Sequence, residues 1–152
     1  MGNQLKNIWI KLMKGGPMVP AEEAIFNKGN GIAGNANLGG RRQVTIIEEE
    51  LWEEMMNELG ASLDPMNRRA NLLINGVSLK ESRGKILHIG ENSIEICGET
   101  KPCWQMDEVL PGLKDTMFPE WRGGAFGKVL TNGKIRRGDP IELVDKNDNV
   151  GG

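Results

Sequence analysis

The stretch "GKILHIGENSIEICGET", residues 84–100, contains two short apolar runs separated by Gly-Glu-Asn at residues 90–92. Glycine and asparagine at that point favour a tight turn. In the second run Ile94 and Ile96 alternate with more polar neighbours, which is the period of a β-strand. The segment therefore predicts two consecutive strands joined by a tight connection.

Strand and turn patterns recur on both sides of this segment. Residues 7–13, NIWIKLM, have the period of a half-buried strand, with Ile8 on the inward face and Trp9 on the outward face. Asn75-Gly76 and Asn132-Gly133 are turn sequences between apolar runs, and Asn132-Gly133 is placed at the tip of a hairpin. The chain is thus expected to contain many short strands.

The glycine content supports the same fold class. The chain has 21 glycines in 152 residues, well above the roughly 7% usual in proteins. Because they are spread along the chain, they predict many tight turns. Short strands need closure to pair their edges. The expected fold is mainly β: a closed or nearly closed β-barrel with one clear amphipathic helix and one or two short helices.

The clear helix is predicted at residues 48–60, EEELWEEMMNELG. Leu51, Met55 and Leu59 recur at positions i, i+4 and i+8, which gives the helix one apolar face. Glutamates in the first turn suit the helix dipole, and Gly60 provides a C-terminal stop. We interpret the apolar face as core packing and the glutamates as a solvated face.

A single domain over residues 1–152 accounts for the pattern, with its core at about residues 5–144 and a frayed tail at 145–152. The sequence contains two cysteines, no recognisable signal peptide and no run long enough to span a membrane, so a cytoplasmic location is expected. The net charge of -2 disfavours a dedicated nucleic-acid binder but leaves a small phosphate-bearing ligand open.

The two cysteines, Cys97 and Cys103, have different predicted environments. Cys97 ends a strand and is expected to pack. Cys103 follows Lys101-Pro102 at the start of a short predicted helix, and both the lysine and the helix N-terminus favour a thiolate. A structural zinc site wants four ligands, and the chain offers only these cysteines and His88. A thiol protease would need His88 beside Cys103, which the sequence cannot establish.

Six of the arginines occur as three adjacent pairs, at residues 41–42, 68–69 and 136–137. They are open to two interpretations. One is surface solubility. The other is an anion pocket, in which guanidinium groups grip phosphate and the glycine-rich loop at residues 29–40 adds backbone N–H groups. The strand-like RQVTII that follows favours a shaped loop within the domain over a linker.

The order of motifs resembles the MOSC domain family, named for the C-terminal domain of molybdenum cofactor sulfurases. The similarity runs over about residues 5–144 and rests on five segments: GIAGNANLGGRRQVTII, NRRANLLINGVSL, GKILHIG, ICGETKPC and RGGAFGKVLTNGKIRRGD. The resemblance implies a β-barrel and molybdenum cofactor (molybdopterin) chemistry.

The resemblance also implies roles for individual residues. Cys103, in the motif matching "KPC", corresponds to the protein ligand of molybdenum and to the catalytic or sulfur-carrying residue. Arg69 and Asn71 correspond to an Arg-x-Asn motif that contacts the cofactor. Arg42, from one of the arginine pairs, and Lys101, next to the Pro-Cys motif, complete the expected cofactor-binding set on the basis of their own chemistry and not of the resemblance.

The chain departs from the family pattern at two places. Many bacterial members carry an acidic residue and a histidine in the glycine-rich motif, where this chain has Asn35 and Ala36-Asn37. This difference puts the bacterial reductase route in doubt. The chain has no counterpart of the extra N-terminal domain of the larger reductases, and no pyridoxal phosphate site is expected in it.

The sequence is compatible with three functions. The first is a cofactor-binding module with Cys103 as metal ligand; as an enzyme it would be a molybdenum-dependent reductase of N-hydroxylated compounds or a sulfur transferase. The second is a persulfide sulfur relay without bound metal. The third is a non-catalytic β-barrel interaction module. The corresponding partners are a cysteine desulfurase, a molybdoenzyme or an electron-transfer protein, with neither nucleic acid nor membrane expected.

Overall fold

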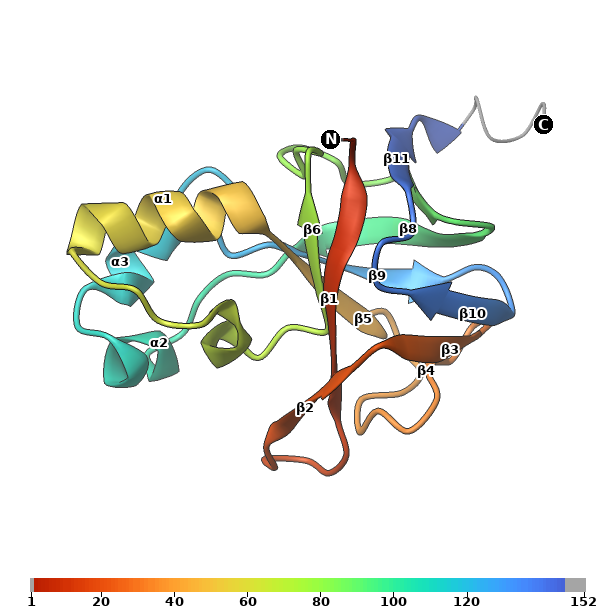
Figure 1. Ribbon diagram of the computed structural model, residues 1–152, viewed down its shortest axis with the longest axis horizontal. Coiled ribbons are helices and arrows are strands. Elements are labelled where there is room, and N and C mark those ends of the chain that lie inside the picture. The colour runs from red at the N-terminus through yellow and green to blue at the C-terminus, as the bar shows by residue number, and fades with distance from the viewer. Residues whose placement is uncertain (1, 147–152) are drawn as a thin grey trace.

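The structure is a computed structural model that describes residues 2–146, and it is mainly β (Figure 1). The strands are β1 (Gln4–Lys11), β2 (Met18–Ala21), β3 (Glu23–Asn27), β4 (Gly31–Ile32), β5 (Val44–Glu48), β6 (Leu72–Asn75), β7 (Ile86–Ile89), β8 (Asn92–Glu99), β9 (Ala125–Val129), β10 (Gly133–Arg136) and β11 (Ile141–Val144). The helices are α1 (Glu49–Leu59), α2 (Gln105–Val109), α3 (Leu113–Met117) and the 3₁₀ helix η1 (Pro65–Arg68). Most of the predicted tail, residues 147–152, lies outside the described residues.

The strands form two sheets. One has eight strands in the order β11-β7-β8-β9-β5-β6-β1-β2, and the other has three in the order β10-β3-β4. All neighbours are antiparallel except β5 and β6, which are parallel. Because parallel neighbours need a crossover connection, α1 and η1 lie between these two strands in the sequence.

The mainly β prediction is confirmed, but no closed barrel is found among residues 2–146. The eight-stranded sheet ends at β11 on one side and β2 on the other. β1 approaches the start of β11 only through an isolated bridge between Gln4 and Pro140 and a few neighbouring backbone bonds, such as Leu5 N–H to the Asp139 carbonyl at 2.9 Å. Proline has no N–H to donate, which limits the ladder at this point.

The main core lies inside the curved sheet and includes Leu5, Ile8, Phe26, Ile46 and Leu72. The inward position of Ile8 is as predicted. Trp9, predicted to face outward, is also buried, because Ile47, Ala70 and Leu73 pack on the other face of the sheet. Strand β1 is therefore covered on both faces.

The helices α1, α2 and α3 lie together at one side of the sheet (Figure 1). The predicted helix is confirmed as α1, and Gly60 ends it with the left-handed φ of 64°. Trp52, Met55 and Met56 pack against Met106 of α2 and Met117 of α3 in a separate core. The short helix predicted after Cys103 is present as α2, and α3 is the second of the one or two short helices expected, although its position was not predicted. None of the helices within residues 2–146 is long and apolar enough to cross a membrane.

The turn predictions have mixed outcomes. The predicted hairpin at residues 84–100 is confirmed, with β7 and β8 antiparallel and Ile89 opposite Asn92. The hairpin predicted at Asn132-Gly133 is wrong, because β9 pairs with β5 and β8 while β10 pairs with β3 of the second sheet. Because β5 and β8 already pair with the two edges of β9, the strand after the turn, β10, pairs in the other sheet.

Candidate functional site

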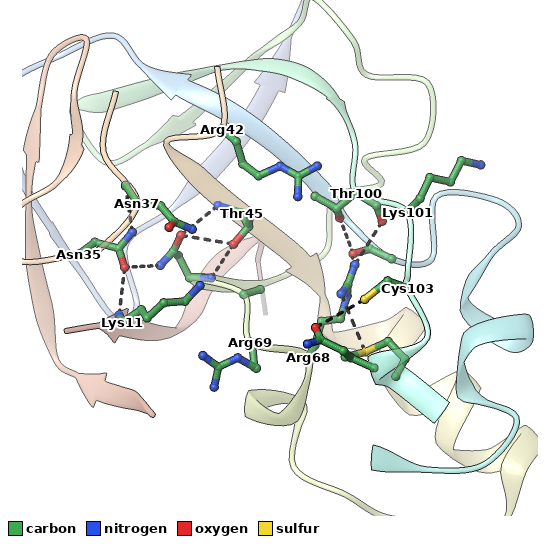
Figure 2. A pocket seen from close by; sticks show the side chains of 15 residues that line it. Lys11, Asn35, Asn37, Arg42, Thr45, Arg68, Arg69, Thr100, Lys101 and Cys103 are labelled. Carbon is green, nitrogen blue, oxygen red and sulfur yellow. Dashed lines mark hydrogen bonds between the residues drawn. The ribbon is translucent and has the colours of Figure 1, made fainter. Parts of the chain in front are cut away.

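A cavity of about 280 Å³ lies where the large sheet meets the α2 region (Figure 2). Its lining comes from segments far apart in the sequence: the end of β1, the glycine-rich loop, β5, the η1–β6 connection, the segment 100–106 and the loop before β9. The lining residues are Lys11, Asn35, Asn37, Arg42, Thr45, Arg68, Arg69, Ala70, Asn71, Thr100, Lys101, Cys103, Gln105, Met106 and Gly123. The cavity therefore gathers every residue that the sequence predicted for the site.

The charge of the lining is one-sided. It contains five cationic side chains, Lys11, Arg42, Arg68, Arg69 and Lys101, and no Asp or Glu among the described residues. Of the five, only Lys101 forms an ion pair within residues 2–146, at 3.3 Å from Glu99. Such a lining suits an anionic ligand, because the other four cations have no carboxylate partner in the described part of the protein.

Arg68 crosses the cavity wall and is held at three points. Its Nε donates to the Gly123 carbonyl and its Nη2 to the Thr100 carbonyl, both at 3.2 Å, and Nη1 lies 3.8 Å from the Met106 sulfur. Burial lowers the pKa of Arg68; negative charge on Cys103 acts in the opposite direction. Arg68 is thus a partly buried cation electrostatically coupled to the thiol. It belongs to one of the arginine pairs noted in the sequence, but its proximity to Cys103 has no local sequence signal.

Lys11 and Arg69 lie at the end of the cavity toward the β1–β2 connection. The pKa of Lys11 is lowered first by burial and then by the positive charge of Arg69. Arg69 has a left-handed φ of 65° and donates from Nη2 to the Gly16 carbonyl at 2.6 Å. Two like charges held together favour an anion between them. Lys11 was missed by sequence reasoning, since a lysine ending a strand has no distinctive pattern.

Arg42 reaches the cavity from the end of the glycine-rich loop, and its guanidinium lies 4.9 Å from the centroid of the Phe126 ring. The loop's backbone N–H groups, in contrast, are largely used inside the protein. Asn35 N–H bonds to Ile32, Ala36 N–H to Lys11, and other loop amides are similarly paired. The loop therefore contributes side chains to the cavity, and the N–H cradle expected for an anion is not present at these positions.

Asn71 is buried and its side-chain amide is fully hydrogen-bonded. Its Oδ1 accepts from the N–H and hydroxyl of Thr45 at 3.1 and 3.3 Å. Its Nδ2 donates to the Trp9 carbonyl and to Asn35 Oδ1, both at 3.1 Å. A direct bond from Asn71 to a ligand would replace one of these bonds, so its evident role is to hold the cavity wall. Its predicted cofactor contact stays a prediction.

Asn35 links the glycine-rich loop to this wall. Its Oδ1 accepts from Lys11 N–H at 2.9 Å as well as from Asn71, and its Nδ2 donates to the Asn37 carbonyl at 3.2 Å. An aspartate here could accept the first two bonds but would face the Asn37 carbonyl with negative charge. The amide at position 35 is therefore suited to this hydrogen-bond arrangement and leaves the cavity charge positive.

The two cysteines differ in burial as the sequence predicted, although Cys97 does not end its strand, because β8 continues to Glu99. Cys97 is buried within β8, with its sulfur 3.7 Å from the Glu95 carbonyl. Cys103 is exposed at the cavity, with Sγ 3.6 Å from Gln105 Oε1. Neither forms a disulfide. Cys103 is therefore the accessible thiol.

The local surroundings of Cys103 differ from those expected. Lys101 extends away from the thiol (Figure 2), and its ammonium lies beside Glu99 and 4.3 Å from the Phe118 ring centroid. The helix α2 begins two residues later, at Gln105, and has only five residues, so its dipole is small. Four other cations line the same cavity as the thiol and have no carboxylate partner among the described residues. They are Lys11, Arg42, Arg68 and Arg69.

His88 is half-buried on β7, opposite Ser93, and does not line the cavity. Within residues 2–146 there is no group of three or more His, Cys, Asp or Glu side chains arranged to hold a metal ion. A metal at Cys103 would therefore have to bring other ligands with it.

Comparison with known proteins places these features in a family. The model of the MOSC domain matches residues 33–142, which is more than half of the chain. No curated protein matches the sequence.

The solved structures with a similar fold include three bacterial proteins that are named for their genes. The YuaD protein of Bacillus subtilis superposes with a TM-score of 0.81 at 21% identity, over 95% of this chain and 97% of that one. YiiM of Geobacillus stearothermophilus gives a TM-score of 0.71 at 17% identity, over 95% and 76% of the two chains. YiiM of Escherichia coli gives 0.68 at 20% identity, over 94% and 70%. At these identities the likeness establishes the fold alone, and it is the family model that supports the conclusion: the chain belongs to the MOSC domain family.

Proposed function

We propose that this protein binds a molybdopterin-type molybdenum cofactor in the cation-lined cavity, with Cys103 as the protein ligand to the metal. The observation that carries the proposal is the combination, in a MOSC domain, of an accessible thiol with four cations that lack a carboxylate partner among residues 2–146. Neither feature alone would distinguish this cavity from an ordinary surface recess.

The residues present fit such a cofactor. A phosphate-bearing pterin is anionic, and guanidinium groups bind phosphate through paired hydrogen bonds. Arg42, Arg69 and Lys11 would bind its polar and phosphate groups. Asn71 and Asn35 would stabilise the cavity wall through their hydrogen bonds. A metal that arrives with ligands from its own cofactor needs one thiolate rather than a complete protein site, which is what Cys103 offers. When bound, the cofactor would supply a redox-active metal.

The chain's own contribution is positional and electrostatic. Cys103 must be a thiolate to ligate a metal. Arg68, fixed to the carbonyls of Thr100 and Gly123, places a positive charge on the same side of the cavity. It would oppose the negative charge that accumulates when a thiolate and an anionic cofactor meet.

Metal analysis tests the proposal directly. The protein is purified from a molybdenum-replete host, and bound molybdenum and pterin are measured for the wild type, Cys103→Ser and Cys97→Ala. We expect metal in the wild type and in Cys97→Ala, and its loss in Cys103→Ser. Absence of molybdenum from the wild type, or equal content in Cys103→Ser, would contradict the assignment.

Charge variants separate cofactor binding from metal ligation. Arg42→Gln and Lys11→Gln should lower the retained pterin although Cys103 is intact. Lys28→Gln, which removes a cation that does not line the cavity, is the matched control and should retain it. If all three variants retain the same amount, the cations do not hold the cofactor.

A sulfur relay is the second candidate, favoured by the exposure of Cys103 and its separation from the buried Cys97. In the transfer, the Cys103 thiolate attacks the terminal sulfur of a desulfurase persulfide, and the desulfurase cysteine leaves as a thiolate. No net oxidation occurs. Intact mass after incubation with a cysteine desulfurase and cysteine should then increase by one sulfur in Cys97→Ala and not in Cys103→Ala. Metal-free wild type combined with this mass increase would favour the relay over the cofactor site.

A cofactor-loaded chain would still need a substrate and a source of electrons. Reduction of N-hydroxylated compounds through an electron-transfer protein, or sulfur transfer to a molybdoenzyme, are the reactions the proposal accommodates. Assays of the loaded protein with an artificial electron donor distinguish them, because only the reductase consumes electrons in each turnover.

A further inference from the structure

The cavity places a nucleophilic sulfur among cationic side chains, and that arrangement has a consequence in the absence of any metal. Cys103 is exposed, whereas Cys97 is buried, so reagents in solution meet one thiol in the native protein. Two carboxylates lie four residues from Cys103 in the sequence, and neither lines the cavity: Glu99 is paired with Lys101 at 3.3 Å, and Asp107 Oδ1 accepts the Lys114 N–H at 3.0 Å. An approaching molecule therefore meets mainly positive charge.

We propose that Cys103 is a site of reversible mixed-disulfide formation that selects anionic low-molecular-weight disulfides, meaning disulfides of thiols that carry carboxylates. The inference goes beyond cofactor binding, since it concerns the chain without cofactor and depends on the charge of the cavity. The ligand class follows from the lining: it pairs an accessible thiol with Arg42, Arg68, Arg69 and Lys11, and includes no carboxylate among the described residues.

The chemistry is a thiol–disulfide exchange. Cys103 gives its proton to solvent, and the thiolate attacks one sulfur of the small disulfide. A new bond forms between Cys103 Sγ and that sulfur while the original S–S bond breaks. The other half leaves with the bonding electron pair as a free thiolate. The disulfide is the oxidant, so Cys103 is oxidised, the departing thiol is reduced, and a second thiol reverses the reaction.

The selectivity comes from the cavity and not from the sulfur itself. Cationic walls raise the local concentration of anions, and such focusing changes association rates by about 10-fold to 1,000-fold. The leaving group also departs as an anion, so the same charges stabilise it. A neutral disulfide lacks the first benefit and gains only the stabilisation of its leaving thiolate, and a cationic disulfide is repelled.

One consequence rests on the proposed function. A mixed disulfide at Cys103 occupies the sulfur that would ligate the metal. Oxidation by an anionic disulfide and loading of the cofactor would therefore exclude each other until a thiol reduces the protein.

The test compares three disulfides of matched size and different charge: dithiodipropionate as the dianion, hydroxyethyl disulfide as the neutral probe and cystamine as the dication. Full-length Cys97→Ala, produced in a host that does not make the cofactor, is reacted with each at neutral pH and low salt. Intact mass gives the rate, and N-acetylcysteine amide serves as the uncharged reference thiol. Because one thiol reacts with all three probes, its thiolate fraction cancels from the ratios.

For each thiol we divide the rate with dithiodipropionate by the rate with cystamine. We expect this ratio to be at least about tenfold larger for the protein than for the reference thiol, and to fall as salt is added. Arg42→Gln and Lys11→Gln should each reduce the ratio, and Lys28→Gln should leave it unchanged. A ratio within about twofold of the reference, or one insensitive to Arg42→Gln and Lys11→Gln, would overturn the inference. Such a failure would leave the molybdenum measurement unaffected, so the two proposals fail separately.

Discussion

Glu48, at the end of β5, is a carboxyl group that is only 7% exposed. Burial raises its pKa from 4.5 to about 7, with Glu50 adding to the effect, although Oε2 accepts the Leu79 N–H at 3.2 Å. The folded protein thus holds a proton that the unfolded chain releases at lower pH. The stabilisation from this proton is complete below the unfolded pKa and is lost as pH rises through the folded pKa.

The free energy of unfolding should therefore fall by roughly 2 to 3 kcal/mol as the pH rises from about 4.5 to about 7 through this one group. In Glu48→Gln this component of the pH dependence should vanish, whereas Glu53→Gln, at an exposed position on α1, should retain it. Urea unfolding at a series of pH values measures the difference. Parallel pH curves for the wild type and Glu48→Gln would contradict the assignment.

Asn71→Ala tests the buried amide that joins β1, β5 and the glycine-rich loop. The substitution removes the bonds that the Trp9 carbonyl, the Thr45 N–H and Asn35 Oδ1 make to the Asn71 side chain. We expect a loss of roughly 2 to 4 kcal/mol in the free energy of unfolding.

Asn67→Ala is the matched control for that loss, because Asn67 is exposed and makes one local bond to the Asp64 carbonyl. It should cost less than about 1 kcal/mol. Denaturant titration measures both losses. Equal losses would mean that the buried hydrogen bonds of Asn71 stabilise the fold no more than the exposed bond of Asn67.

Among the elements, α1 could be predicted almost completely because its information is local; the exception is Glu48, which was expected on the solvated face of the helix and is the buried last residue of β5. Leu51, Met55 and Leu59 set the period, and Gly60 ends the helix. Asn132-Gly133 shows the opposite case: turn chemistry indicates that the chain reverses, but it does not identify the strand with which the next segment pairs. The burial of Trp9 was missed for a similar reason, since the residues that cover it come from β5, β6 and the segment before β6.

Trp52 tests how α1 is attached to the remainder of the helical region. Its ring packs among the methionines of α1, α2 and α3, and Nε1 donates to the Leu63 carbonyl at 2.8 Å. Trp52→Phe keeps most of the apolar contact and removes the hydrogen bond, so we expect a loss of about 1 to 2 kcal/mol. Trp52→Ala also creates a cavity and should cost roughly 3 to 5 kcal/mol. Thermal unfolding should rank the two variants in that order.

At the scale of the whole molecule, the sequence predicted which motifs matter but not how they assemble. Arg42, Arg69 and Cys103 were found through short motifs and family resemblance, and the structure brings them to one cavity. Lys11 and Arg68 were missed, because their role arises only when β1 and η1 meet the segment after β8. Barrel closure was over-predicted, since a count of short strands does not establish that the first and last strands pair.

The concentration of cations also has a measurable effect on the whole fold. Unpaired like charges repel each other, and an anion that enters the cavity should relieve the repulsion. Inorganic phosphate should therefore raise Tm more than chloride at equal ionic strength, with about 1.4 kcal/mol of stabilisation at about ten times its Kd. Arg42→Gln should reduce the difference between the two salts. An identical response to phosphate and chloride would argue against an anion site.

The cavity lies between two separately packed cores, and Arg68 connects its walls. Thr45 belongs to β5 and Asn71 directly precedes β6, whereas Met106 belongs to the core formed with α1 and α3. The distance between the walls can therefore change while both cores stay packed, so local opening costs less than global unfolding. Amide hydrogen exchange in α2 should accordingly be faster than in β5, and Arg68→Lys should accelerate it further. A ligand that contacts both walls would slow exchange in α2 most. The exchange rate of this short helix therefore measures whether the cavity holds a ligand.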